Sequence, residues 1–478
     1  MANDVQEQLI RFPGYSVEET AEEEVSLRPD DLARHKRVSL PFLFIWISLM
    51  AFGFIMMFSA SFGESFVNSS IYINVIEDEA ALQDLPEALR TEVVADATAS
   101  AARQLRMSVA GSIIAIAIAI FVPFRQLLRP GLREIAYYVI TALLIYTAFK
   151  GVTSQGAQRW VVIGAVQFQP SELAKIGVVY YLSSYFYERQ QQRKYKPEME
   201  APWDKKESDL KNKHRETFRD FTRPLLRMGL WVILVLLQPH MSGAIILTVL
   251  TILMFLMGKI PGRSLARGFA LHAIPLLLVV LLLFSLLIPV FYDKSMPEFV
   301  SERFAHSQKR MDLYRDRDSV DADGRRQVEQ AEIAFGVGGL TGVGLGRSTQ
   351  KLNWLAEAHN DFIYPIIGEE LGLIGTLSVL LMFMLFLIGG FFIAARASNM
   401  AARNIAAGFT FLIVFQAFLN MAVATSLIPA TGISLPFFSA GGTANVIFAL
   451  AAALILCVSK TGVQRNPLLV SVLDHNKN

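Results

Sequence analysis

Charged residues are scarce in this chain of 478 residues: they make up 18% of it, against roughly a quarter in an ordinary soluble protein. Cysteine is almost absent, because Cys457 stands alone in an apolar run, and this excludes an intramolecular disulfide. The opening segment 1–38 lacks a long apolar stretch, so we expect a polar tail there and no secretory signal peptide. No internal repeat and no low-complexity tract is visible. These absences argue against a soluble globular protein and against a disulfide-rich secreted one.

Hydrophobic residues supply 53% of the chain and gather in long runs. A helix needs about 20 consecutive apolar residues to cross a bilayer, and Ala406–Ile428 is one run of this kind. We therefore expect an all-α membrane protein with about ten transmembrane helices. The expected spans are 39–60, 107–123, 136–150, 168–186, 226–239, 243–258, 268–292, 362–394, 404–428 and 434–459.

Lysine and arginine mark one side of the expected membrane. They end the N-terminal tail at Arg37, fill the connection 187–225 and follow the last span. The connection 61–106 has the opposite character, with eight acidic residues against three arginines. Because basic connections stay in the cytoplasm, we place both termini there. The basic loop 187–225 could also be no more than a solvated hairpin attracted to anionic lipid headgroups.

The expected organisation is a single transmembrane domain, 39–460, between two cytoplasmic tails, 1–38 and 461–478. Two outer loops interrupt this domain, 61–106 and 293–361, and the second lies between the seventh and eighth spans. Most connections run to only a few residues. Both loops are therefore expected to do more than join helices.

Ionisable residues inside or beside a span are costly there and are candidates for function. Glu172 and Lys175 are three residues apart on the expected fourth helix, so they share one face and can pair. Pro170 fits the first turn of that helix, and Arg159 lies shortly before it in the sequence Gly-Ala-Gln-Arg-Trp. The pair could equally be structural, serving only to orient the helix.

Two further clusters combine proline with small residues. His240 lies in the sequence Gln-Pro-His-Met-Ser-Gly between the fifth and sixth spans, where a broken turn can line a cavity. The segment Thr431–Thr443 includes Ser439 and Gly441 and permits close backbone approach to a ligand or to another helix. A hydrogen-bonded structural histidine and plain helix packing are the respective alternatives.

The expected outer loop and the span after it carry the densest charge. Asp318 and Asp321 belong to a run of alternating arginines and aspartates. Asp361 follows in the sequence His-Asn-Asp-Phe-Ile, and Glu369 and Glu370 follow in Gly-Glu-Glu-Leu-Gly. Alternating charges in a loop are usually solvated, so taken alone this run indicates little.

Together and in this order, the motifs resemble those of the SEDS family, the group of RodA, FtsW and SpoVE. Members carry GA-x-RW, QPSELAK, DFI followed by GEELG, and TG-x-x-LP-x-x-S, all of which stand in this sequence. The resemblance implies ten transmembrane helices with a large outer loop between the seventh and eighth. The chain departs from the family at His240, where Asp is usual, and at Ala440, where Tyr is usual. The loop around Asp321 also lacks the family's proline.

The resemblance implies a peptidoglycan glycosyltransferase that polymerises lipid II at the outer face of the bacterial cytoplasmic (inner) membrane and releases undecaprenyl pyrophosphate. It implies an aspartate base. Asp321 fits best because it keeps the three-residue step to Gly324, and Asp318 is the reserve. Arg159 and Lys175 are the expected pyrophosphate contacts. The remaining expected substrate-binding residues are Glu172, His240, Asp361, Glu369, Glu370, Ser439 and Gly441.

The implied partners are a class B penicillin-binding protein, acting as the transpeptidase, and other cell-wall machinery for cell shape or cell division. No nucleic acid is expected. A divalent cation, magnesium or manganese, could help to neutralise the pyrophosphate, although no cluster of ligand residues in the sequence demonstrates one. Two alternatives stay open: a lipid II flippase, and a non-catalytic scaffold for a transpeptidase. Against a flippase, no inverted repeat is visible.

Overall fold

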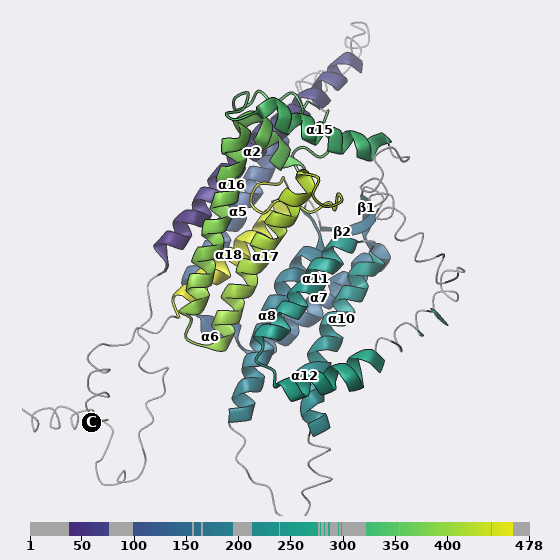
Figure 1. Ribbon diagram of the computed structural model, residues 1–478, viewed down its shortest axis with the longest axis vertical. Coiled ribbons are helices and arrows are strands. Elements are labelled where there is room, and N and C mark those ends of the chain that lie inside the picture. The colour runs from purple at the N-terminus through teal and green to yellow at the C-terminus, as the bar shows by residue number, and fades with distance from the viewer. Residues whose placement is uncertain are drawn as a thin grey trace, which may run out of the picture.

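The protein is mostly helical over the part of the chain that its structure, a computed structural model, describes (Figure 1). This part comprises residues 38–75, 99–154, 157–163, 166–194, 213–238, 240–275, 322–352, 354–440 and 442–461, with a few single positions between 278 and 298.

Long helices form from the apolar runs. The longest are α2 (Leu40–Val75), α5 (Ala99–Phe121), α7 (Pro130–Lys150), α8 (Pro170–Lys194), α16 (Ile363–Ala395) and α17 (Met400–Ala424). Somewhat shorter are α10 (Arg223–Leu237), α11 (Met241–Met257), α15 (Ala322–Gly338) and α18 (Gly442–Ser459). Short elements complete the set: α6 (Phe124–Leu127), α12 (Gly262–Gly268) and the π-helices η1 (Phe218–Thr222) and η2 (Phe269–Ala273).

Several of these helices can cross a membrane. By length and composition, four described stretches are long and apolar enough, and three shorter apolar helices accompany them. The four are Leu40–Ser61, Pro130–Lys150, Ile363–Ala395 and Met400–Ala424, and the three are Arg106–Phe121, Met241–Met257 and Thr443–Ser459. The chain is therefore a multi-pass membrane protein.

The helices can be compared with the expected spans. Those expected at 226–239, 243–258 and 362–394 coincide with α10, α11 and α16 to within a few residues. The start expected for the last span, residue 434, is wrong, because α18 begins at Gly442. The preceding loop keeps a non-helical course because the Asn445 side chain accepts from Phe437 N and donates to Ser439 O. The expected seventh span, 268–292, falls largely outside the described residues.

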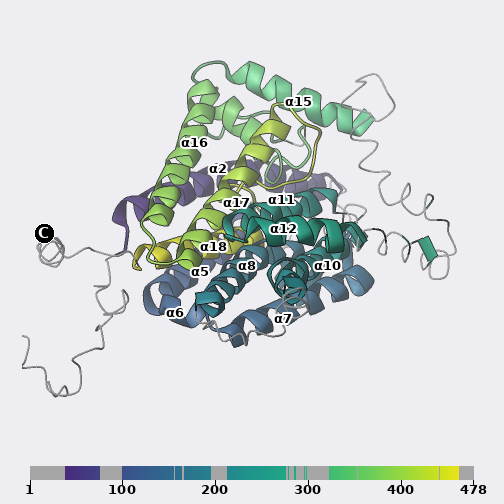
Figure 2. The same cartoon turned by 60° about the horizontal axis from the view of Figure 1, so that its bottom comes forward.

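The helices form two groups that share one core (Figures 1 and 2). In the first group, α18 packs on α5 and α17, and α16 packs on α17 and α2. In the second, α7, α8, α10 and α11 pack together, and α8 joins the groups by packing on α17. Trp46 and Trp231 are among the largest fully buried side chains. Cys457 on α18 is also buried, with its Sγ 3.5 Å from Val122 O.

A small antiparallel sheet, which the sequence analysis did not predict, lies between α7 and α8 of this mostly helical chain. Its strands are β1 (Val152–Ser154), β2 (Ala157–Ile163) and β3 (Val166–Phe168), in the order β1-β2-β3. Valine and isoleucine favour strands, and a glycine stands in each connection, in Gln155–Gly156 and in Gly164–Ala165. Such connections are typical of short hairpins.

The segment expected as the outer loop 293–361 contains the helix α15, which lies across one end of the bundle. We call this end, at the top of Figure 1, the α15 end, and the opposite end, where α12 lies, the α12 end. α15 packs on α16. Residues 322–352 and 354–361 of this expected loop are described, more than in either of the other two long expected loops, 61–106 and 187–225.

Helix α16 is broken close to α15. Gly372 has φ 67° and ψ −162°, a backbone conformation that residues other than glycine rarely adopt. The break frees backbone groups, and the glycine-rich segment after α15 pairs with them. Val343 N and Gly344 N donate to the carbonyls of Glu369 and Glu370, both at 3.0 Å, and Leu373 N donates to Gly339 O at 2.9 Å. The sequence Gly-Glu-Glu-Leu-Gly is therefore the point where α16 and the segment after α15 join.

Candidate functional site

Helix α8 begins at the α15 end with Pro170, as predicted, and carries an ion pair in its first turns. Glu172 Oε2 and Lys175 Nζ are 2.7 Å apart, which confirms the pairing predicted from their spacing. Lys175 is 2% exposed and also donates a 2.6 Å hydrogen bond to Gln416 Oε1 on α17. The buried ammonium thus uses one charged and one neutral acceptor, and it links the two groups of helices.

His240 lies beside this pair, in the turn that joins α10 to α11. Its Nδ1 is 3.1 Å from Ser171 Oγ and 3.2 Å from Gln169 Nε2. The amide nitrogen of Gln169 can only donate, so Nδ1 accepts and the proton of the neutral ring is on Nε2. Gly243 lies against the ring, since a Cβ there would come within 2.5 Å of Nδ1. These contacts therefore hold the imidazole in a single buried position.

Positive charge surrounds this histidine. Burial first, and then the charges of Arg159 and Lys175, lower the pKa of His240 well below its ordinary value. The hydrogen bond that Nδ1 accepts likewise requires the neutral form of the ring. Arg159 is half-buried on β2, so the small sheet is the element that brings it to the site. The charges of Arg159 and Lys175, set against the single carboxylate of Glu172, leave a net positive charge beside this ring, as the binding of an anion requires.

Ser439 belongs to the loop before α18, which is fixed to the segment before α16. The Ser439 hydroxyl donates to Asn360 O at 2.8 Å and accepts from Leu435 N at 2.6 Å. Ala440 N donates to His359 O at 2.8 Å. The Ser439 hydroxyl therefore both donates and accepts within the protein, and these two hydrogen bonds shape the loop.

Asp361 lies at the same junction, half-buried. Its carbonyl accepts a 2.8 Å hydrogen bond from Asn420 Nδ2, which also donates to Ile433 O at 2.7 Å. Gln416, one turn earlier on α17, donates to Ser434 O at 3.3 Å. Two amide side chains of α17 thus connect Lys175 and Asp361 to one loop.

Glu369 and Glu370 are fully buried, and both hold the segment 348–351. Glu369 accepts from Thr349 N and Thr349 Oγ1, each at 2.9 Å, and from the Ser348 hydroxyl. Glu370 pairs with Lys351 Nζ at 2.7 Å. Their role as substrate-binding residues stays a prediction, and the contacts seen here are with the chain itself.

Three expected site residues, Asp318, Asp321 and Gly441, lie outside the described residues. α15 begins directly after Asp321 in the sequence, and the helix therefore starts beside the expected base. Within the described ranges, no group of three or more His, Cys, Asp and Glu residues lies together so as to hold a metal ion.

The family model for cell cycle proteins of the FtsW, RodA and SpoVE group matches residues 87–463. The chain belongs to this family. A curated relative in Geobacter sp. (strain M18), named as a probable peptidoglycan glycosyltransferase FtsW, is 31% identical over 318 residues, which cover 66% of this chain and 75% of the relative.

Solved structures agree with this membership of the FtsW/RodA/SpoVE family at the level of the fold. One belongs to a study of polymerization and crosslinking by a peptidoglycan synthase complex: TM-score 0.54, 22% identity, 88% of this chain and 97% of that one covered. Another is a mutant of the rod shape determining protein RodA of Thermus thermophilus: TM-score 0.53, 21% identity, with 90% and 99% covered. At these identities the likeness carries the fold alone.

Sequence reasoning missed several residues that this FtsW/RodA-type fold brings to the site. Gln416 and Asn420 are polar, four residues apart and inside an apolar run, which was a usable signal for a shared face directed into the protein. Lys351 carried no such signal. It lies nineteen residues before Glu370 in a segment of mixed composition, and only the fold brings the two together.

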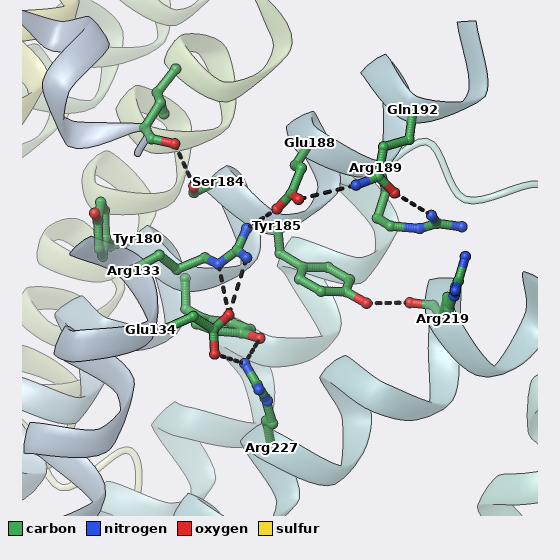
Figure 3. Close-up of polar contacts among 12 residues, drawn as sticks. Arg133, Glu134, Tyr180, Ser184, Tyr185, Glu188, Arg189, Gln192, Arg219 and Arg227 are labelled. Carbon is green, nitrogen blue, oxygen red and sulfur yellow. Dashed lines mark hydrogen bonds and ion pairs between the residues drawn. The ribbon is translucent and has the colours of Figure 1, made fainter. Parts of the chain in front are cut away.

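A second polar cluster closes the α12 end of the second helix group (Figure 3). Arg133 on α7 pairs with Glu188 on α8 at 2.6 Å and with Glu134 at 3.1 Å. Arg227 on α10 pairs with Glu134 at 2.5 Å and contacts the Tyr181 hydroxyl. Three helices are thus tied together where sequence reasoning expected a cytoplasmic surface.

Helix α8 also reaches η1 at this end. Asp220 on η1 is 2% exposed and pairs with Arg189 at 2.8 Å and with Arg193. Because the Glu172–Lys175 pair lies within α8, this helix is held to its neighbours by the Lys175–Gln416 hydrogen bond at one end and by the Asp220 ion pairs at the other.

Proposed function

We propose that this protein polymerises lipid II into peptidoglycan glycan strands at the outer face of the bacterial cytoplasmic membrane. The observation that carries the proposal is the meeting of Arg159, Lys175 and neutral His240 at the α15 end, in a chain of this family. That group suits a pyrophosphate, and the curated relatives are named as probable peptidoglycan glycosyltransferases.

The reaction joins two lipid-linked disaccharides. A sugar hydroxyl of one attacks the anomeric carbon of the other, a new C–O bond forms, and the bond from that carbon to the pyrophosphate oxygen breaks. Undecaprenyl pyrophosphate leaves with the bonding electron pair, and the hydroxyl proton passes to a carboxylate. We assign the carboxylate to Asp321, with Asp318 as the reserve.

The other residues have supporting roles in this proposal. Arg159 and Lys175 stabilise the negative charge that develops on the departing pyrophosphate. Glu172 fixes Lys175, as their 2.7 Å contact supports. His240 offers its Nε2 proton as a neutral donor. Asp361, which precedes α16, and Ser439 and Gly441, which precede α18 in the sequence, are assigned to substrate binding in the same proposal.

The proposal sets the orientation in the membrane. The α15 end faces outward and the α12 end faces the cytoplasm, with ten spans and both termini cytoplasmic. The ionic cluster around Arg133 and Arg227 then lies on the cytoplasmic side, where basic residues are retained. The expected partner is a class B penicillin-binding protein. Support comes from the similar fold in a peptidoglycan synthase complex, which coordinates polymerization and crosslinking.

One experiment tests the proposal against both alternatives. The purified protein is reconstituted with lipid II, and glycan polymer and lipid II scrambling are measured in parallel. Polymer is the expected result. Scrambling without polymer would identify a flippase, and neither activity, with a transpeptidase still bound, would identify a scaffold.

A further inference from the structure

Lys351 has no assigned role, yet it lies at the centre of a buried polar cluster that joins three segments far apart in the sequence. Its Nζ is 2.7 Å from Glu370 Oε1 on α16 and 3.0 Å from Ser59 Oγ on α2. Ser59 in turn donates to the Glu370 carboxylate at 2.8 Å. Glu370 is 0% exposed and Lys351 is 5% exposed. The ammonium thus lies between two helices and contacts both.

The same cluster fixes the segment that carries Lys351. Ser348 N donates to Glu370 Oε1 at 3.4 Å, and Gln350 N donates to Glu369 Oε2 at 3.3 Å. Lys351 N donates to Ser348 Oγ at 3.2 Å, which closes the turn on itself. Both carboxylates of the Gly-Glu-Glu-Leu-Gly sequence are therefore used in holding residues 348–351.

This segment connects the end of α15 to the start of α16. On one side of it, residues 339–344 pair with the broken backbone of α16. On the other side, the Gln327 side chain of α15 donates to Ala356 O at 3.1 Å. Helix α15 begins directly after Asp321 in the sequence. The contacts that fix this helix, at Gln327 near its start and at residues 339–344 after its end, therefore also limit where the expected catalytic carboxylate can lie.

We propose that Lys351 is a positioning residue for glycan polymerisation, holding α15 at the right place over α2 and α16 through Glu370 and Ser59. The inference rests on the proposed function, and it gives Glu370 a role through Lys351 rather than through the substrate. A displacement of about 1 Å between reacting groups can cost about 100-fold in rate. The buried Lys351 ammonium, which contacts both Glu370 and Ser59, is suited to preventing such a displacement.

Lys351→Met removes the cation and leaves Glu370 buried without its ion-pair partner. We expect kcat for polymerisation to fall by about 100-fold while KM for lipid II stays unchanged, since the group around Lys175 is intact. Hydrogen exchange of residues 325–346 should become faster. Lys351→Arg keeps the charge and should restore most of kcat.

Two further variants keep the test decisive if Lys351→Met folds poorly. Lys351→Met with Glu370→Gln removes both charges, so the folded yield should recover while kcat stays low. Ser59→Ala should lower kcat less than Lys351→Met, because the ion pair remains. Glu329→Gln breaks the exposed Arg325–Glu329 pair of α15 and is the matched control, with no change expected.

The outcomes separate cleanly. Recovery of kcat together with folded yield in the double variant would make the pair structural only, and unchanged exchange in Lys351→Met would remove the positioning role. Absence of polymer from the unmodified protein would defeat the proposed function instead, while the exchange measurement would still report on the contact.

Discussion

Two lysines illustrate how this protein handles charge at the scale of single residues. Lys175 and Lys351 are both buried, and each contacts one carboxylate and one neutral oxygen. A buried ion pair is weak evidence for stability, because the attraction barely offsets the loss of hydration. Ionisable side chains in such places are more often kept for function. Both lysines lie at the α15 end, where the proposed chemistry takes place.

Breaking the Glu172–Lys175 pair should reveal which purpose it serves. Glu172→Gln removes the carboxylate charge beside the buried ammonium of Lys175 and leaves it neutral acceptors alone among the contacts above, and we expect roughly 3–5 kcal/mol of destabilisation. Glu172→Gln with Lys175→Met should recover the yield of folded protein, measured by size-exclusion chromatography, but not polymerisation. A fully active double variant would mean that the pair only orients α8.

The catalytic base is predicted from the sequence, at Asp321. Asp321→Asn keeps the size and hydrogen bonding of the side chain but cannot accept a proton. Since a positioned base contributes about 10²–10⁴-fold, we expect lipid II binding to persist and polymer to disappear. The gel assay for glycan strands measures this directly.

Neighbouring carboxylates are the controls for this prediction. Asp316→Asn and Asp323→Asn should cost little, because both are expected to be solvated charges. Activity in Asp321→Asn together with its loss in Asp318→Asn would move the base by three residues. Activity in all four variants would rule out an aspartate base in this loop.

At the scale of elements, the junction of α15 with α16 depends on a close approach of two backbones. A Cβ on Gly338 would lie 1.9 Å from Gly368 O, and one on Gly342, which has φ +79°, would lie 2.1 Å from Glu370 O. Neither neighbour can move without disturbing a helix. The contact therefore needs glycine at both positions.

Gly338→Ala should accordingly separate α15 from α16. Overpacking of this kind costs about 1–3 kcal/mol, so we expect a lower melting temperature in detergent and less polymer. Gly336→Ala on the same helix is the matched control, since a Cβ there meets nothing within 4 Å. It should stabilise α15 by about 0.5–1 kcal/mol. Equal effects of the two changes would contradict the close-approach argument.

The sequence predicted those features that depend on residues close together in the chain. Apolar runs located α10, α11 and α16, and the three-residue spacing predicted the pairing of Glu172 with Lys175. The sheet was missed because its strands are short and lie between two apolar helices, in a stretch that the expected spans leave as a connection. The start of α18 was missed because Asn445 acts on a loop several residues earlier. Long-range contacts such as Ser59 with Glu370 leave no pattern in the sequence.

At the scale of the whole molecule, the direction of insertion decides whether the proposed chemistry is possible. Reporter fusions at Glu92 and near Gly324 should report the outer side, and fusions near Lys206 the cytoplasm. The reason is the contrast between the acidic loop 61–106 and the basic loop 187–225. Paired alkaline phosphatase and fluorescent-protein fusions measure this. A cytoplasmic signal near Gly324 would remove glycan polymerisation from consideration, because that reaction takes place outside.

The buried state of Cys457 makes the protein convenient for spectroscopy. The chain has no other cysteine, and this one is 1% exposed. Thiol-directed probes should therefore leave the unmodified protein almost unlabelled, and a cysteine introduced at the half-exposed Arg325 would take the label alone. A spin label or fluorophore there would follow α15 during turnover without prior removal of the native cysteine.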